Sequence, residues 1–149
     1  MRSGDDRPAF ERGTGFLLAR LGSLAAHSWT TFLTAHGLAQ SQYAVLVVLK
    51  DQGPMGQRRL AHLVAVDARN IVPVLDTLAA KGLIERRPDP ADGRRRTVVL
   101  TAKGDALADT IAAEAALGQD DFLGALDNQD REHLNGLLQR LYEAHVRKS

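Results

Sequence analysis

Residues 67–104 read DARNIVPVLDTLAAKGLIERRPDPADGRRRTVVLTAKG, and this stretch decides the fold. In its first half, apolar residues recur with the i, i+3, i+4, i+7 spacing of one buried helix face: Ile71, Val74, Leu75 and Leu78. Asp67 can accept hydrogen bonds from the free N–H groups at the start of such a helix. Gly82 can adopt the left-handed conformation that ends it. The pattern predicts a helix from Asp67 to Gly82.

The second half of the stretch predicts a β-hairpin and the start of another helix. A strand opens at 83–84, and a turn is favoured by three residues that interrupt regular structure: Pro88, Pro90 and Gly93. The run at 97–100, rich in β-branched residues, indicates the returning strand. Thr101 is a suitable cap for the helix that follows.

Positive charge gathers on this hairpin, whose arginines are Arg86, Arg87, Arg94, Arg95 and Arg96. Asp89 and Asp92 also lie here and could suggest a metal loop. Short Asx side chains, however, commonly bond to nearby backbone N–H groups in turns. We expect these two residues to shape the turn and to hold Arg94 in place.

A second helix precedes the first by a short turn. Residues 59–64 have one apolar side, and 65–67 join the two helices, as in a helix-turn-helix. The helix at 67–82 would be the recognition helix of this motif, and its outward face would present Ala68, Arg69, Asn70 and Pro73. Arginine pairs well with guanine, and asparagine with adenine, in the major groove. Pro73 stands roughly six residues into the predicted helix, where it removes one backbone hydrogen bond and can kink the axis.

A helix sized for the major groove beside a basic β-loop sized for the minor groove is suited to reading double-stranded DNA. The predicted fold is mainly α: a winged helix-turn-helix with a small β-hairpin wing and flanking dimerisation helices. The candidate DNA contacts are Arg58, Asp67, Ala68, Arg69, Asn70, Pro73, Arg86, Asp92, Arg94, Arg95 and Arg96.

The run 82–104 resembles the wing of the MarR family of bacterial transcriptional regulators. Its motifs at the family's spacing are Gly82-Leu83, Arg86, Asp89-Pro90, Asp92-x-Arg94 and Leu100-Thr101-x-x-Gly104. Further matching motifs outside this run are His36-Gly37-Leu38, Gln42-Tyr43 and Leu60-Ala61. The family usually has arginine where Gly93 stands and a small residue where Arg95 stands, which shifts the expected wing contacts toward Arg95.

The resemblance implies a homodimeric, sequence-specific transcriptional regulator that binds a pseudo-palindromic DNA operator. It further implies a repressor released by a small phenolic or aromatic carboxylate ligand. Two alternatives stay open. One is a constitutive DNA-binding regulator without an effector, and the other is a winged-helix protein-interaction module whose wing docks on an acidic partner.

Composition agrees with a folded protein. A chain of 149 residues suffices for one domain, 1–149, and a hydrophobic content of 44% argues against disorder. No apolar run approaches the roughly 20 residues needed to cross a bilayer. Residues 1–8 lack the apolar core of a signal peptide. We expect a cytoplasmic protein with no membrane partner.

Charge is distributed unevenly along the chain. Between Arg58 and Lys103, ten Lys and Arg residues oppose five Asp and Glu residues, which leaves a net charge of +5. Between Gly104 and Asp130, seven acidic residues face no Lys or Arg, which leaves −7. A basic middle segment suits binding to phosphates, and the acidic segment should face away from DNA. The alternative is an ordinary solvated surface.

Helical patterns flank the winged helix-turn-helix lobe, which we place at 41–103 with Ser41 as the cap of its first helix. Dimerisation helices are expected at 9–36 and 104–147, with Asp127 or Asn128 as the cap of the last helix. They hold more apolar residues than a small winged helix needs to cover. This surplus predicts burial against a second subunit, around Leu17, Leu21, Leu134, Leu137, Leu138 and Leu141. The alternative is that the chain ends fold back on their own core.

The sequence offers little support for catalysis. We therefore expect a protein that is not an enzyme and has no catalytic residues, metal or cofactor. The sequence has no cysteine, which excludes disulfides and thiolate metal sites. Its five histidines show no close metal spacing, and it has no Gly-rich phosphate loop or nucleophile elbow.

A small-molecule site is suggested by polar residues in the first helix. Arg20, Ser23 and His27 stand at i, i+3 and i+7, and Arg12 lies two turns earlier on nearly the same side. A cation with hydrogen-bonding neighbours suits a carboxylate, so Arg12, Arg20 and His27 are candidate ligand contacts. The alternative is surface polarity or an ion pair between subunits. Trp29 and Tyr43 could line such a ligand site, but we expect both to pack in the core.

Overall fold

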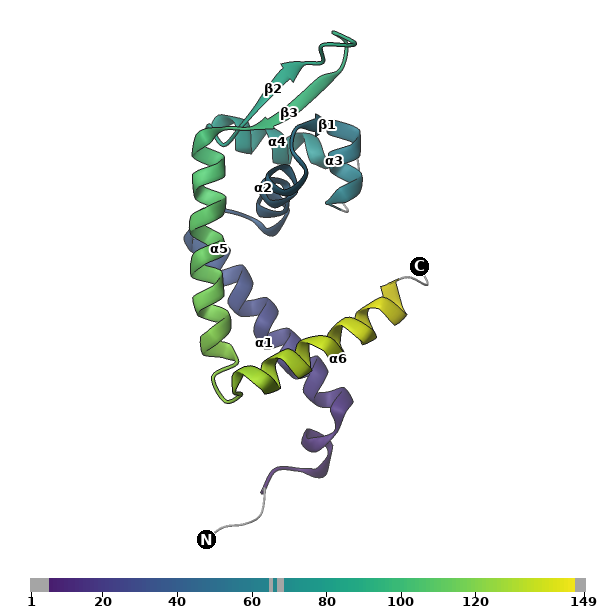
Figure 1. Ribbon diagram of the computed structural model, residues 1–149, viewed down its shortest axis with the longest axis vertical. Coiled ribbons are helices and arrows are strands. Elements are labelled where there is room, and N and C mark those ends of the chain that lie inside the picture. The colour runs from purple at the N-terminus through teal and green to yellow at the C-terminus, as the bar shows by residue number, and fades with distance from the viewer. Residues whose placement is uncertain (1–5, 65, 67–68, 147–149) are drawn as a thin grey trace. The chain divides into compact units, whose positions relative to one another are not determined.

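The structure is a computed structural model that describes residues 6–64, 66 and 69–146 (Figure 1). The chain forms two compact units, residues 1–111 and residues 112–149. Its elements in order are η1 (Ala9–Arg12), α1 (Thr14–Ala35), α2 (Gln40–Gln52), β1 (Met55–Gly56), α3 (Gln57–Leu63), α4 (Ile71–Ala80), β2 (Ile84–Pro88), β3 (Arg96–Leu100), α5 (Ala102–Phe122) and α6 (Asn128–Val146). The predicted fold class is confirmed: a mainly α chain with a small antiparallel sheet.

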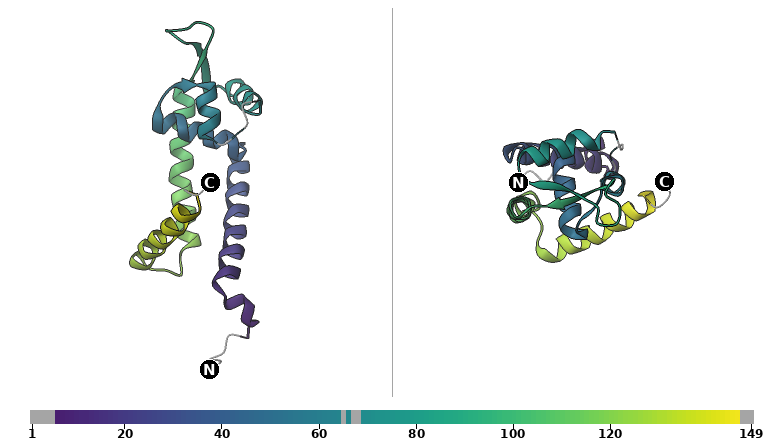
Figure 2. Two further views of the ribbon diagram at one scale, coloured as in Figure 1. Left: turned by 90° about the vertical axis from the view of Figure 1, so that its right-hand side faces the viewer. Right: turned by 90° about the horizontal axis from the view of Figure 1, so that it is seen from above.

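The sheet is built around the predicted hairpin. Its strand order is β1-β3-β2, and β3 pairs antiparallel with both neighbours. Ile84 lies opposite Leu100 and Pro88 lies opposite Arg96, so β2 and β3 pair along their whole length. The hairpin extends past the helices of its own unit (Figure 2), which leaves its tip open to solvent.

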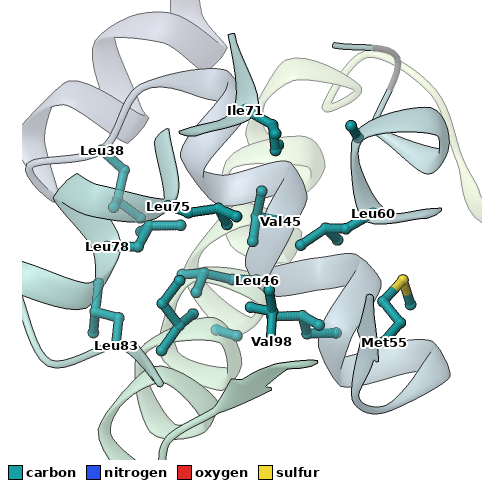
Figure 3. Packing of buried hydrophobic residues seen from close by; sticks show 14 of the residues in the cluster. Leu38, Val45, Leu46, Met55, Leu60, Ile71, Leu75, Leu78, Leu83 and Val98 are labelled. Carbon is teal, nitrogen blue, oxygen red and sulfur yellow. The ribbon is translucent and has the colours of Figure 1, made fainter. Parts of the chain in front are cut away.

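The core of the first unit lies between α2, α3, α4 and the sheet (Figure 3). The predicted apolar face of α4 is buried, because Ile71, Leu75 and Leu78 are all fully enclosed and Val74 packs against the same cluster. Other fully buried members of the cluster are Val45, Leu46, Leu60, Val98 and Ile111. This packing holds α4 and the hairpin in one lobe.

The end of α4 agrees with the sequence prediction. Gly82 has a φ of 73°. The N–H of Gly82 donates to the Ala79 carbonyl, and the N–H of Leu83 donates to the Leu78 carbonyl, each at 3.0 Å. Such a pair of bonds beyond a left-handed glycine satisfies the last carbonyls of a helix. The chain then turns directly into β2.

The predicted cap at Ser41 is wrong. Helix α2 begins at Gln40, so Ser41 lies inside its first turn. The flanking residue is Ala39, whose N–H donates a 3.0 Å hydrogen bond to Gln42 Oε1. The Gln42 side chain thus reaches back from the first turn and satisfies an N–H group at the start of the helix.

The start of α5 follows the prediction. The backbone N–H of Gly104 donates to the Thr101 hydroxyl at 3.0 Å, which is an N-cap hydrogen bond. Gly104 is buried, and a Cβ at this position would overlap the backbone carbonyl of Leu83. The first turn of α5 therefore lies directly against the segment that leaves α4.

The second unit contains the last part of α5 and the whole of α6. Arg131 stabilises the loop between these two helices. Its guanidinium donates to the Leu123 and Leu126 carbonyls at 3.2 and 3.1 Å, and it forms a 3.0 Å ion pair with Asp120. Asp127 accepts the N–H of Asp130 at 2.8 Å. Of the two predicted caps for α6, Asp127 and Asn128, the structure therefore has Asp127.

An aromatic cluster joins α1 to α2. The Trp29 ring lies 5.6 Å from Phe32 and 5.4 Å from Tyr43, measured between ring centroids. All three residues are partly buried against the core, as expected for Trp29 and Tyr43. Burial raises the pKa of the Tyr43 phenol, since desolvation disfavours the phenolate. The ring therefore packs as a neutral group.

No single helix among the described residues is both long and apolar enough to cross a membrane. Helices α1 and α2 meet those criteria only when taken together, across a bend of 81°.

Candidate nucleic-acid interface

The recognition helix is shorter than the sequence predicted. Helix α4 begins at Ile71 rather than at Asp67, and its flanking residue is Asn70. Asp67 and Ala68 lie outside the described residues, so the predicted cap at Asp67 does as well. Arg69 and Asn70 belong to the turn that leads into α4 and not to its first helical turn.

Pro73 explains part of this difference. It is the third residue of α4, where a backbone N–H has no acceptor within the helix, so the absence of that group costs no helical hydrogen bond. The predicted place of Pro73, about six residues into the helix, is therefore wrong. The Pro73 carbonyl accepts a 3.0 Å bond from the Thr77 hydroxyl.

Three residues around the start of α4 face solvent. Arg69, Asn70 and Pro73 are exposed, whereas Ile71 is fully buried. Asn70 forms no cap hydrogen bond with its side chain. The amide and the guanidinium thus stand on the outer side of the helix start, where a base edge can be reached.

The turn of the wing is shaped by its two aspartates, as predicted. Asp89 Oδ1 accepts the N–H of Ala91 at 2.8 Å, and Asp92 Oδ1 accepts the N–H of Arg94 at 3.1 Å. These are the short Asx contacts that stabilise turns. Asp92 thus contacts the backbone of Arg94 and not its guanidinium. The ion pair of Asp92 is with Arg95, whose Nε lies 3.8 Å from Asp92 Oδ2.

Three consecutive arginines leave this turn. Arg94, Arg95 and Arg96 are exposed, and the side chain of Arg95 is 80% accessible to solvent. Arg87 is engaged nearby, since it forms a 2.9 Å ion pair with Glu85 on the same strand. Arg58, in the first turn of α3, is also exposed. The tip of the hairpin therefore presents a dense positive charge to its surroundings.

The chain is similar in sequence to known transcriptional regulators. The sequence profile of the MarR family matches residues 38–95. A relative from Thauera aromatica, a putative transcriptional regulatory protein for the hcr operon, is 38% identical over 132 residues, which covers 86% of this chain and 78% of the relative. The chain belongs to the MarR family.

Two further relatives of this MarR-family chain carry more specific descriptions. The HTH-type transcriptional repressor NicR of Pseudomonas putida is 32% identical over 107 residues, which is 72% of this chain and 68% of NicR. A solved structure of Bordetella bronchiseptica BpsR, titled for the regulation of its DNA binding by 6-hydroxynicotinic acid, is 26% identical with a TM-score of 0.71. That match covers 92% of this chain and 98% of BpsR.

Arg86 has a different environment from the other wing arginines. Its side chain is 27% exposed, and its Nη2 lies 2.5 Å from Asp76 Oδ1 on α4. The sequence analysis did not identify Asp76 as a partner of Arg86. The two residues stand ten positions apart, one on a helix and one on a strand, so no periodic pattern relates them. Arg86 thus connects the wing of this MarR-family lobe to its recognition helix.

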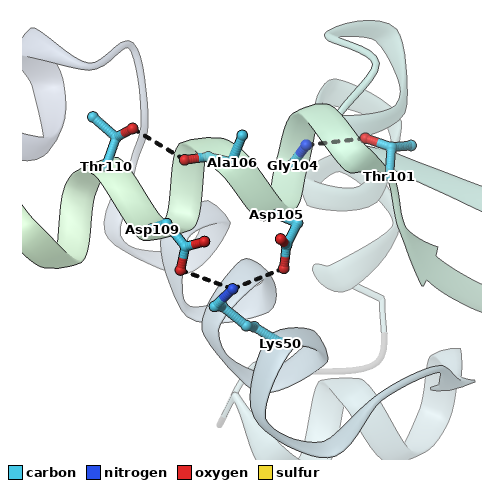
Figure 4. Close-up of polar contacts among 7 residues, drawn as sticks. All are labelled: Lys50, Thr101, Gly104, Asp105, Ala106, Asp109 and Thr110. Atoms are coloured by element: carbon cyan, nitrogen blue, oxygen red, sulfur yellow. Dashed lines mark hydrogen bonds and ion pairs between the residues drawn. The ribbon is translucent and has the colours of Figure 1, made fainter.

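A second contact missed by the sequence analysis joins α2 to α5 (Figure 4). Lys50 Nζ lies 2.8 Å from a carboxylate oxygen of Asp105 and 2.8 Å from one of Asp109. Hydrogen bonds to Asp105 and to Asp109 raise the pKa of the Lys50 ammonium. Asp105 and Asp109 stand one turn apart on α5, a spacing that lets one ammonium bridge both.

The candidate ligand contacts are only partly brought together. Arg20 and His27 lie on α1 and are exposed. Arg12 lies in the separate helix η1, and the extended residue Gly13 interrupts the helical path to α1. The prediction that Arg12 shares a helix face with Arg20 is therefore wrong. Among the described residues, no group of three or more metal-ligating side chains gathers in one place.

Proposed function

We propose that this MarR-family chain is a sequence-specific double-stranded DNA-binding regulator that acts as a dimeric repressor and is released by a small aromatic acid or phenol. The observation that carries the proposal is the exposed arginine run Arg94–Arg96 at the tip of a hairpin that shares one packed lobe with α4. A lobe of this kind sets a helix in the major groove and a basic loop beside it.

The distribution of charge supports phosphate binding. The winged segment between Arg58 and Lys103 has a net charge of +5, while 104–130 has −7. Most of the affinity of such a protein for DNA would come from phosphate contacts and the counterions they release. Base selection would come from the exposed residues that precede α4, Arg69 and Asn70, together with Pro73 on its outer face.

Exposed apolar side chains support a dimer. In α6 no residue is buried, and Leu137, Leu138 and Leu141 are 40–47% exposed. Leu17 and Leu21 of α1 are likewise exposed, at 38% and 49%. Several exposed large apolar side chains on one helix usually mark a contact with another chain. A two-fold dimer would then require a pseudo-palindromic operator.

An aromatic carboxylate is the ligand class we favour. BpsR, whose DNA binding is regulated by 6-hydroxynicotinic acid, provides the chemical precedent, and Arg20 and His27 of α1 supply exposed groups for pairing with an anion. A ligand changes DNA affinity only through unequal affinity for the DNA-competent and incompetent forms. DNA must then weaken ligand binding by the same factor that the ligand weakens DNA binding.

The test begins with the operator. Sequencing of genomic fragments bound by the purified full-length protein would identify it, and anisotropy titrations between about 50 and 200 mM salt should show a steep loss of affinity. Calorimetry with benzoates, phenols and hydroxynicotinate, with and without operator, would measure both sides of the linkage. Duplex binding that no compound alters would favour the effector-free regulator. A protein that binds no duplex would favour the protein-interaction module.

A further inference from the structure

One ion pair joins the wing to the recognition helix. Arg86 of β2 and Asp76 of α4 meet through Nη2 and Oδ1 at 2.5 Å. The two elements are otherwise connected by the tight turn at 81–83 and by the shared apolar core. The pair is therefore placed to fix the direction of the wing relative to α4.

The alternation of β2 explains why Arg86 makes this contact. Side chains at i and i+2 of a strand lie on one face, so Arg86 shares its face with Ile84, which is 2% exposed. Its partner across the hairpin is Val98, which is fully buried. Arg86 thus leaves the strand on the side that faces the lobe.

The other face of the same strand is outward. Glu85 and Arg87 occupy it, are both exposed, and pair with each other at 2.9 Å. Arg86 Nε, by contrast, is buried and has no hydrogen-bond partner within the described part of the chain. Only the two terminal nitrogens of this guanidinium remain available for hydrogen bonds, and one of them, Nη2, is bound to Asp76.

We propose that Arg86 is a positioning residue that orients the wing on α4, and that Asp76 raises DNA affinity even though it is a carboxylate. The proposal rests on the proposed DNA-binding function and replaces the expectation that Arg86 contacts DNA directly. Without Asp76, a half-buried cation loses its partner, which carries an energetic cost that rearrangement of the wing would relieve. The wing would then be held less firmly before binding, so ordering it on DNA would lower the affinity, while the arginines at the tip would still pair with the same phosphates in the complex.

The two possible roles of Arg86 make opposite predictions. If Arg86 bound a phosphate, its loss would make the slope of log K against log salt shallower by about 0.9. Removal of the Asp76 charge would then leave DNA binding unchanged or strengthen it, since a carboxylate repels phosphates. If the pair positions the wing, each change weakens binding while the salt slope stays as in the wild type.

The experiment uses the full-length protein and the tightest duplex from a selection with random sequences. Asp76→Asn and Arg86→Gln should each weaken binding by about tenfold, and the double variant should be no weaker than either single variant. Glu85→Gln is the matched control, because it removes a carboxylate from the outward face of the same region, and it should not weaken binding. Asp76→Asn that binds as tightly as the wild type, or more tightly, would overturn the proposal.

Amide hydrogen exchange gives an independent readout. In Asp76→Asn, whose side chain is 58% exposed in the wild type, exchange in 87–97 should be faster than in the wild type and in Glu85→Gln. Unchanged exchange in that segment would also overturn the proposal. If the wild type binds no duplex, the proposed function fails, yet the exchange comparison still decides whether the ion pair orients the wing.

Discussion

The Thr101 hydroxyl donates a 2.7 Å hydrogen bond to the backbone carbonyl of Gly82. The same hydroxyl accepts the N–H of Gly104, so one side chain joins the residue that ends α4 to the first turn of α5. The backbone N–H of Thr101 also donates to the Leu83 carbonyl at 3.1 Å. Thr101 therefore connects the DNA-facing lobe to the helix that leads out of it.

Replacement of Thr101 with valine preserves the shape of the side chain and removes both hydroxyl contacts. We expect the free energy of unfolding to fall by about 0.5–2 kcal/mol, the usual range for loss of an N-cap. Urea unfolding followed by circular dichroism would measure it. Thr101→Ser, which retains the hydroxyl, should remain close to the wild type, and equal losses for both variants would rule out the hydrogen bonds as the cause.

Gly104→Ala should destabilise the lobe because its Cβ would overlap the Leu83 carbonyl, which is backbone and cannot rotate away. Forced overpacking of this kind costs about 1–3 kcal/mol. Gly118→Ala in the same helix is the control, since its Cβ would meet no atom within 4 Å. Chemical denaturation should show a loss for the first variant and no loss for the second.

At the wing, the double variant Arg94→Ala/Arg95→Ala should weaken binding to every duplex without changing the melting temperature. The slope of log K against log salt should become shallower by about 0.9 for each arginine that had neutralised a phosphate. Arg140→Ala removes a positive charge from α6 and should have no such effect. Wild-type affinity in the double variant would remove the wing from the mechanism.

Arg69→Ala should relax sequence preference at one base position, with a cost of about 1–3 kcal/mol if the contact to guanine is bidentate. Arg69→Lys retains the charge but not the planar fork, so it should relax the same position while keeping the salt slope. Selection from random duplexes with the three proteins would compare their consensus sequences. Three identical sequences would mean that Arg69 does not read bases.

Leu137→Glu with Leu141→Glu should convert the dimer to a monomer, because charges would be buried in its apolar contact. Light scattering at micromolar concentration measures the outcome. Val47→Glu is a suitable control: Val47 is exposed to a similar extent, 41%, but lies on α2. The dimer should also require two half-sites about 10 base pairs apart, and a wild-type monomer would contradict the proposed assembly.

Local signals predicted most of the fold. The glycine that ends α4, the cap at Thr101 and the Asx contacts of the wing all depend on residues within a few positions of one another. Such features follow from helix periodicity, caps and turn chemistry. The start of α4 was placed too early because Asp67 is a good cap in isolation, whereas Pro73 fits best within the first turn.

Contacts between residues far apart in the chain could not be predicted from the sequence. Lys50 and Asp105 stand 55 positions apart, and neither belongs to a motif that requires the other. The pairing of Arg86 with Asp76 depends on which face of β2 turns inward, and that is known only once the register with β3 is known. The break at Gly13 was missed because polar spacing alone does not reveal where one helix ends and another begins.

The aromatic cluster between α1 and α2 gives the protein an intrinsic optical probe. Trp29 is the single tryptophan of the chain, and Tyr43 lies close enough to pass excitation energy to it. Emission from this one indole therefore reports on the joint between α1 and α2 with no other tryptophan contributing. An effector that binds beside α1 can be detected by a shift in this emission, without a label and at the concentrations used for DNA titrations.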